Sequence, residues 1–208
     1  MQASTTDLRV VRTKESIREA FIDLIEEKGF EAITVKDITT KAKINRGTFY
    51  AHYQDKYDLM TKCEEKILRE LTDMIVENYS DILADLNTNQ PVTTPFTILT
   101  SIFEYIEQNR RFMKGMLGSK GDLSFQTKLK KFVWNSIFES NHHSQHPLIK
   151  PEHFLVPPEY LISYVASAHI GVIQQWLHSD SAESPQEMAR ILSTITINGP
   201  FSAAGLKK

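Results

Sequence analysis

Hydrophobic residues recur every three or four positions along most of this chain, which is the spacing of an amphipathic α-helix. The pattern first appears between Thr13 and Lys28, and Gly29 follows where a helix is expected to end. The apolar stripe of this first helix consists of Ile17, Phe21, Leu24 and Ile25. No strand-like alternation persists anywhere, so the sequence predicts an all-α fold.

Two shorter helices follow, and each begins at a residue whose side chain can cap it. Thr34 precedes the second helix, with Asp37 placed to complete a capping box. Asn45 precedes the third helix, which we expect over Arg46–Tyr53 after a break that includes Lys43. Three short helices with a tight break between the last two describe a helix-turn-helix.

The remaining pattern predicts a series of longer helices. Asp55 caps the first of them, and Ser184, Pro185 and Glu187 provide the cap, first-turn proline and capping-box acid of the last. That last helix is expected to stop at the Asn-Gly-Pro sequence of residues 198–200. The other expected ranges are 56–83, 96–108, 111–117, 124–140 and 159–179, with polar, proline-bearing connections at 87–95 and 141–158.

Composition narrows the class of protein. The 208 residues, 41% of them hydrophobic and 24% charged, fit a small domain followed by a larger one, and we expect a division into residues 1–60 and 61–208. A single cysteine, Cys63, excludes an intramolecular disulfide and a cysteine-based zinc site. Residues 1–11 lack an apolar signal segment, and no apolar run reaches the roughly 18 residues of a membrane span. We therefore expect a soluble, cytoplasmic protein.

The net charge is −2, but the charges are unevenly distributed, and a basic stretch lies near the N-terminus. Between residues 36 and 56 the only acids are Asp37 and Asp55. The basic residues of the same stretch are Lys36, Lys41, Lys43, Arg46 and Lys56. Because phosphate binding depends on where cations lie rather than on their sum, this stretch is compatible with DNA binding.

The third helix has the composition of a recognition helix. Arg46 can donate two hydrogen bonds to a guanine or a phosphate. Gly47 and Thr48 are small enough to allow close approach to DNA, and Tyr50 has a polar tip. Lys56 begins the next helix, whose N-terminal backbone N–H groups would favour a phosphate.

The run from Ile33 to Leu59, ITVKDITTKAKINRGTFYAHYQDKYDL, resembles the DNA-binding domain of the tetracycline-repressor (TetR) family. The positions that match the family pattern are Thr34, Ile38, Gly47, Thr48, Tyr50, His52, Tyr53, Lys56 and Leu59. Three positions depart from it: Lys43 replaces the usual glycine of the turn, Thr39 an alanine, and Tyr53 a phenylalanine. A lysine in the turn could add a phosphate contact.

The resemblance implies that Thr34, Thr48, Tyr50, His52 and Lys56 contact the DNA backbone, and that Arg46 and Gly47 lie at the base-reading end. The full set of expected DNA-binding residues is Thr34, Lys43, Asn45, Arg46, Gly47, Thr48, Tyr50, His52 and Lys56. Plainer roles remain open. Tyr50 could be a partly buried core aromatic, His52 could cap or pack, and Thr34 and Asn45 are helix caps in any case.

The resemblance also implies a C-terminal helical bundle that senses a ligand and dimerises through its last two helices. Segments 105–118 and 169–192 are similar to a Gram-positive subclass of the family. The helix over 159–179 is apolar around most of its circumference, which suits a symmetric partner or, alternatively, the centre of its own bundle. The expected interface consists of Tyr164, Ile173, Leu177, Met188, Ile191, Leu192 and Ile195.

Aromatic residues and methionines in the C-terminal part are candidates for a ligand pocket. They are Phe103, Ile106, Phe112, Met113, Met116, Phe132, Trp134, His169 and Trp176. Such residues at helical spacing are more often plain core, and His169 could simply bond a neighbouring side chain. The loop histidines His142, His143, His146 and His153 could bind a metal, but their spacing specifies no ligand geometry, so we expect no metal or other cofactor.

These patterns predict a homodimeric repressor that binds a palindromic DNA operator and responds to an unidentified small molecule. The alternative is a regulator controlled by a protein partner, or an activator, with no small-molecule effector. A helical enzyme is not supported, because the chain has no glycine-rich phosphate loop, no Ser/His/Asp or Cys/His signature and no paired Glu-x-x-His motif.

Overall fold

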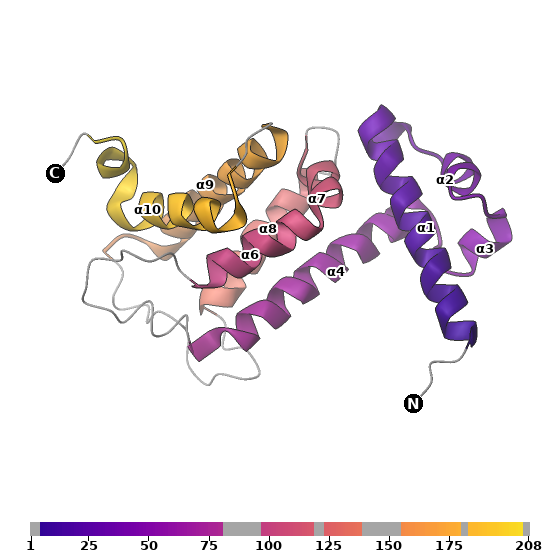
Figure 1. Cartoon of the computed structure of the whole chain (residues 1–208), viewed down its shortest axis with the longest axis horizontal. Helices are drawn as coiled ribbons and strands as arrows, with labels where there is room; N and C mark the ends of the chain where they lie inside the picture. The colour runs from indigo at the N-terminus through magenta and orange to yellow at the C-terminus, as the bar shows by residue number, and fades with distance from the viewer. Residues whose placement is uncertain (1–4, 81–96, 119–122, 139–154, 180–182, 206–208) are drawn as a thin grey trace. The chain divides into compact units, whose positions relative to one another are not determined.

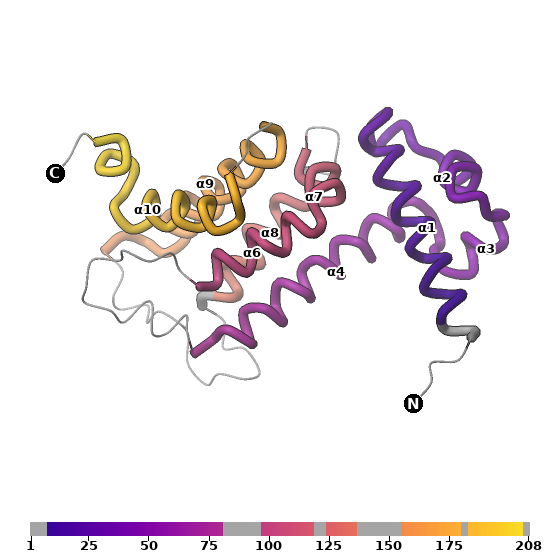
Figure 2. Tube along the Cα trace, viewed as in Figure 1, coloured from indigo at the N-terminus to yellow at the C-terminus, as the bar shows by residue number. Residues whose placement is uncertain are grey.

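The computed structural model describes residues 5–80, 97–118, 123–138, 155–179 and 183–205, and all regular elements among them are helical. Figure 1 shows their order along the chain, and Figure 2 traces the same path. The elements are α1 (Thr5–Lys28), η1 (Phe30–Ala32), α2 (Val35–Lys41), α3 (Arg46–Tyr50), α4 (Lys56–Glu77), α6 (Thr97–Gln108), α7 (Arg110–Leu117), α8 (Leu123–Phe138), α9 (Pro158–His178) and α10 (Pro185–Ala203). The predicted all-α fold is confirmed.

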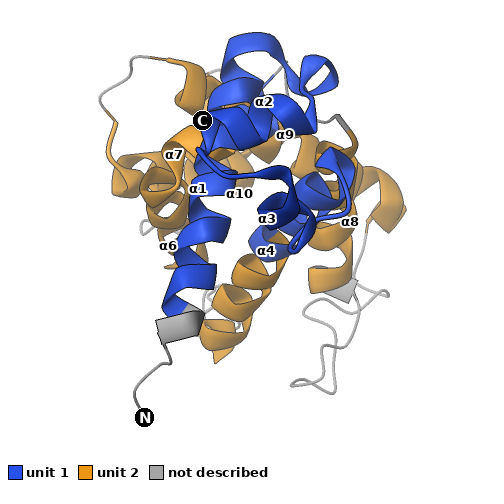
Figure 3. Ribbon diagram, turned by 90° about the vertical axis from the view of Figure 1, so that its right-hand side faces the viewer, with its two compact units in different colours: residues 1–67, 115–123 blue, residues 68–114, 124–208 orange. Residues whose placement is uncertain are grey.

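The chain forms two compact units, coloured separately in Figure 3. Unit 1 comprises residues 1–67 and 115–123, and unit 2 comprises residues 68–114 and 124–208. The divisions between the two units therefore fall within α4, within α7 and after the first residue of α8. A functional domain boundary at residue 60 stays a prediction.

The core of unit 1 is built on the stripe that the sequence predicts for α1. Ile17 and Phe21 are fully buried, and the ring of Phe21 meets that of Phe30 edge to face, with 6.0 Å between centroids. Ile38 from α2 and Phe49 from α3 are also fully buried. Helix α2 packs against α1, and α3 packs against α2.

Two helix boundaries in unit 1 differ from the prediction. Helix α1 begins at Thr5 rather than Thr13, and its added turns expose Leu8 and Val11, so they carry no buried stripe for a periodicity argument to detect. Helix α3 ends at Tyr50 rather than Tyr53. The carbonyl of Phe49 accepts the backbone N–H groups of both His52 and Tyr53, which closes the helix in a tight turn.

In unit 2, α6 packs against α10, and α10 also contacts α9. Phe103 of α6 and Trp176 of α9 are buried, and their rings meet edge to face at 5.2 Å. The backbone leaves helical geometry at Gly199 (φ 75°), where the sequence predicts that the last helix stops, and a further helical turn follows this kink and extends to Ala203. The predicted Ser184 cap and Glu187 capping box are confirmed.

Within the described residues, no helix is long and apolar enough to cross a membrane. The same part of the chain holds no cluster of three or more His, Cys, Asp or Glu residues that could bind a metal ion. The loop histidines His142, His143, His146 and His153 lie outside the described residues.

Candidate nucleic-acid interface

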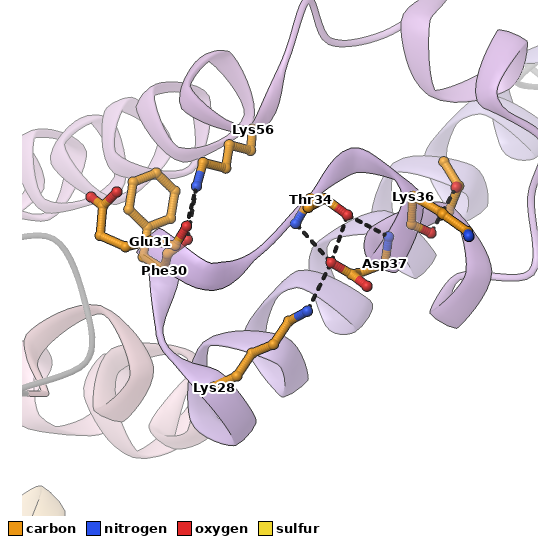
Figure 4. Close-up of polar contacts among 8 residues, drawn as sticks. Lys28, Phe30, Glu31, Thr34, Lys36, Asp37 and Lys56 are labelled. Carbon is orange, nitrogen blue, oxygen red and sulfur yellow. Dashed lines mark hydrogen bonds and ion pairs between the residues drawn. The ribbon is translucent and has the colours of Figure 1, made fainter.

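The first turn of α2 is fixed by a reciprocal capping box (Figure 4). Thr34 Oγ1 accepts the backbone N–H of Asp37 at 3.2 Å, and the backbone N–H of Thr34 donates to Asp37 Oδ2 at 2.8 Å. The ammonium of Lys28 lies 2.7 Å from the same carboxylate oxygen. Lys28 and the Thr34 donors hold the pKa of Asp37 well below its usual range, so this box is intact at neutral pH.

The turn between α2 and α3 depends on a lysine in a left-handed conformation. Lys43 has φ 55°, where the family pattern has a glycine, and its side chain is exposed. The backbone N–H of Lys43 donates to the carbonyl of Thr40, and that of Ile44 donates to the carbonyl of Thr39. These bonds offset the strain that a side chain suffers at positive φ, and they place a cation at the outside of the turn.

Asn45 fixes the beginning of α3. Its Oδ1 accepts the backbone N–H of Thr48 at 2.7 Å and the Thr48 hydroxyl at 3.1 Å. A Cβ atom added to Gly47 would lie 3.2 Å from that oxygen, so a small residue at 47 protects the cap as well as leaving room for a ligand. The predicted Asn45 cap is confirmed.

Exposure divides the aromatic residues after the turn into two groups. Tyr50 is 55% exposed, whereas Phe49 is fully buried and Tyr53 is 8% exposed. Because neighbouring residues on a helix point in different directions, burial of Phe49 turns the ring of Tyr50 outward. The alternative of Tyr50 as a core aromatic is therefore wrong, while Phe49 and Tyr53 are core residues. Thr48 and His52 are half-buried.

Three cations of the basic stretch remain available for an external anion. Lys36, Lys43 and Arg46 are exposed, and none of them has an ion-pair partner within the described part of the chain. Lys41 differs, because its ammonium pairs with Asp23 and Glu27 of α1. Lys36 adds to the positive charge of the basic stretch, but it was not among the site residues expected from the sequence.

Lys56 is bound inside unit 1, as Figure 4 shows. Its ammonium donates to the carbonyls of Phe30 at 3.1 Å and Glu31 at 2.8 Å, and lies 4.8 Å from the centre of the Phe30 ring. At the start of α4, Asp55 Oδ1 accepts the backbone N–H groups of Tyr57 and Asp58, both at 2.8 Å. The donors expected to hold a phosphate here are thus used within the protein.

The exposed cations on α2 (Lys36), in the following turn (Lys43) and on α3 (Arg46) can therefore pair with a polyanion. Local hydrogen bonds fix the backbone from which Lys43 and Arg46 project. Arg46 can read a base edge bidentately or pair with a phosphate, and the adjacent Gly47 presents no side chain to keep a duplex away.

The expected ligand-pocket residues are divided between the two units. Met116 belongs to unit 1 and the others to unit 2. The buried members are Phe103, Ile106, Phe112, Met113, Met116 and Trp176. Trp176 is further engaged by its Nε1–H bond to the carbonyl of Glu183 and by Arg110, whose guanidinium stacks 4.7 Å from its ring centre. The simple core interpretation holds for these residues.

The remaining pocket candidates lie in different surroundings. Phe132 lines a groove beside α4, and Trp134 is half-buried. His169 Nε2 lies 2.9 Å from the Thr196 hydroxyl, so the histidine bonds a neighbouring side chain across α9 and α10. Burial lowers the pKa of His169 below its ordinary value.

The expected dimer residues divide by burial. Tyr164 is exposed, and Ile173, Ile191 and Ile195 are half-buried. Leu177, Met188 and Leu192 are buried within the chain's own unit 2, so they are not available to a partner. Sequence periodicity could not separate these two groups, because both lie on apolar faces of the same helices.

Two family models match the chain. Residues 17–63 match a model described as bacterial regulatory proteins of the tetR family, and residues 93–198 match a transcriptional regulator C-terminal region of TetR type. The second match alone covers about half of the 208 residues.

Curated relatives match about a third of the chain. An uncharacterised HTH-type transcriptional regulator of Bacillus subtilis, YxbF, is 43% identical over 68 residues, covering 32% of this chain and 18% of that protein. IcaR of Staphylococcus epidermidis, a negative transcriptional regulator of a biofilm operon, is 29% identical over 68 residues, covering 33% of this chain and 37% of its own. The match spans less than half the length of each relative.

A solved structure extends the likeness to the whole fold. A TetR-family regulator from Syntrophomonas wolfei superposes with a TM-score of 0.60 at 18% identity, over 94% of this chain and 96% of that one. The fold is thus shared well beyond the N-terminal motif. The two model matches show that the chain belongs to the TetR family of bacterial transcriptional regulators.

Proposed function

We propose that this chain is a homodimeric repressor that binds a palindromic operator through α3 and is released by a small molecule. The observation that supports DNA reading best is Arg46, an exposed arginine without an ion-pair partner in the described residues, on a helix whose start Asn45 fixes. The proposed contact set is Thr34, Lys36, Lys43, Asn45, Arg46, Gly47, Thr48, Tyr50 and His52. Lys56 is left out of this set, because its hydrogen bonds to Phe30 and Glu31 stabilise unit 1, which carries the proposed contact surface.

An exposed apolar surface on α9 and α10 supports dimerisation. Tyr160 is 70% exposed, Tyr164 57% and Phe201 61%, and Leu161 and Ile197 lie at the margin of exposure. Large apolar side chains gathered on two consecutive helices are typical of an interaction surface. A symmetric dimer would cover this surface and would pair two recognition helices for two operator half-sites.

Repression is suggested by the names of IcaR, a negative regulator, and KstR2, a repressor, whereas DhaS is named as an operon activator. A small molecule that binds unit 2 more tightly in a state with wrongly spaced recognition helices would lower operator affinity. An activator, or control by a protein partner, is the alternative that the experiment below can reveal.

Genome-wide capture of bound DNA fragments, followed by titration of the recovered operator, tests the proposal. We expect saturable binding by wild type and a large loss for Arg46→Ala. Light scattering should give a dimer mass, and Tyr164→Glu should give a monomer. Derepression of neighbouring genes on deletion supports a repressor, whereas their silencing would show an activator. A protein that recovers no enriched fragment would contradict DNA reading altogether.

A further inference from the structure

A groove between α4 and α8 lies within unit 2 and has a volume of about 370 Å³. Of the expected pocket residues, only Phe132 lines it. Leu68 and Ile75 of α4 complete an apolar side with that ring. This volume is at the small end of the roughly 300–1,000 Å³ typical of small-molecule sites, so the groove fits a small ligand rather than a large one.

The polar lining of the groove has one sign of charge. Lys128 and Lys131 both line it, and no carboxylate does. They are three residues apart on α8, and Asn135 follows one turn later, so all three share one helical face. The Lys131 ammonium and the Asn135 carboxamide have no polar partner in the part of the chain that the structure describes.

The hydroxyl groups that line the groove do not alter its positive charge. Thr72 and Ser136 donate to the carbonyls of Leu68 and Phe132 in their own helices, at 2.8 and 2.9 Å. The Lys131 ammonium, which no side chain of the described residues neutralises, would attract an anion into the groove. It would not attract a neutral ligand, and it would repel a cation.

We propose that this groove binds a small organic anion, with a carboxylate or phosphate at Lys128 and Lys131 and an apolar body against Leu68, Ile75 and Phe132. The inference rests on the proposed effector-dependent repression, since it names the chemical class of that effector. Charge-assisted hydrogen bonds give the head group its selectivity, and burial of the apolar body adds affinity.

Calorimetric titration of the full chain with hexanoate, hexyl phosphate, hexan-1-ol and hexylamine tests the proposal. At least one of the two anions should bind saturably, and the alcohol and amine should bind about tenfold more weakly or not at all. The comparison of hexanoate with hexyl phosphate identifies the head group.

Paired lysine variants locate the site. Lys131→Gln should weaken the anion about tenfold, equivalent to about 1.4 kcal/mol. Lys130→Gln makes the same charge change on the same helix outside the groove lining, and should leave the affinity unchanged. Circular dichroism checks that both variants keep their helical content.

Equal binding of hexanol and hexanoate, equal losses in the two variants, or no saturable binding of any probe would each overturn the anion site. Operator titration is measured separately. If the anions bind the groove without changing operator affinity, the anion site is supported, but its role as the effector site is contradicted. If a molecule of another chemical class lowers operator affinity while the anions do not bind, effector-dependent repression is supported and the anion site is contradicted.

Discussion

The candidate functional residues of the two units differ in exposure: those of unit 1 lie on its surface, whereas most of those expected in unit 2 are buried in its core. In unit 1, the proposed DNA contacts project from short helices whose starts are fixed by hydrogen bonds spanning three residues, as at Thr34 and Asn45. In unit 2, the aromatic residues that looked like a binding site are buried against one another, as Phe103 is against Trp176. A surface held by local bonds can be recognised from sequence, whereas a hollow between helices cannot.

The largest expected effect tests whether Phe103 is core rather than pocket. Phe103→Ala should lower the free energy of unfolding by about 3–5 kcal/mol, because it removes a fully buried ring and leaves a cavity. Chemical denaturation followed by circular dichroism measures this loss. Phe103→Leu is the control and should cost less than about 1.5 kcal/mol. Wild-type stability in Phe103→Ala would contradict the core assignment.

Arg46 provides the corresponding test in unit 1, where function rather than stability should change. Arg46→Ala should cost about 1–3 kcal/mol of operator affinity if the guanidinium reads a guanine, with discrimination lost at one base step. Fluorescence anisotropy with the operator and its single-base variants measures both. Arg69→Ala, at an exposed arginine of α4, is the control and should bind normally. A uniform loss across all base variants would make Arg46 a backbone contact.

Features fixed by local hydrogen bonds were predicted correctly from the sequence, whereas features that depend on residues far apart in the chain were not. The caps at Thr34, Asn45 and Ser184 were predictable because both partners of each bond lie within three residues. The role of Lys56 was not, since the carbonyls that it binds are 25 and 26 residues away. The early start of α1 also escaped prediction, because its first turns bury no regular stripe.

The groove in unit 2 shows a second kind of feature that the sequence did not reveal, a hollow lined by residues of two helices. Lys128 and Lys131 look in sequence like ordinary surface charges, and only their placement opposite Leu68 gives them a shared apolar neighbour. Periodicity predicted where α6 and α9 lie in the chain, but it does not distinguish a filled core from a cavity. Burial and packing supply that distinction.

Loss of the α2 cap should be a moderate effect that spares unit 2. Thr34→Ala removes the hydroxyl that accepts the Asp37 N–H, and should lower the stability of unit 1 by about 1 kcal/mol. Hydrogen exchange of amides in α2, compared with those in α10, would show where the loss occurs. Thr34→Ser keeps the cap, and Thr40→Ala changes an exposed threonine of the same helix. Faster exchange in all three variants would argue against a capping effect.

Acid should weaken the two units at different pH. Burial lowers the pKa of His169, so the unfolded chain binds its proton more readily, and the contribution is present above about pH 6.5 and lost as the pH falls through the lowered value. The pKa of Asp37 is also lowered, from a carboxyl value near 4, so its contribution disappears only below about pH 4. Exchange measured from pH 7 to pH 3.5 should therefore show α9 and α10 loosening before α2. His169→Gln should remove the first change, and its persistence would exclude His169 as the cause.

The smallest expected effect separates two lysines that the sequence placed in the same class. Lys43 is exposed without an ion-pair partner among the described residues, so Lys43→Ala should reduce the salt dependence of operator binding by about 0.9 in log K against log salt. Lys56 instead bonds two carbonyls, so Lys56→Ala should leave that slope unchanged and lower the unfolding free energy by about 1 kcal/mol. Anisotropy titrations from 50 to 200 mM salt, paired with denaturation curves, measure both quantities. A slope that falls for Lys56→Ala would mean that its ammonium leaves Phe30 and Glu31 to meet a phosphate, and the contrast between supporting and contacting cations in unit 1 would then fail.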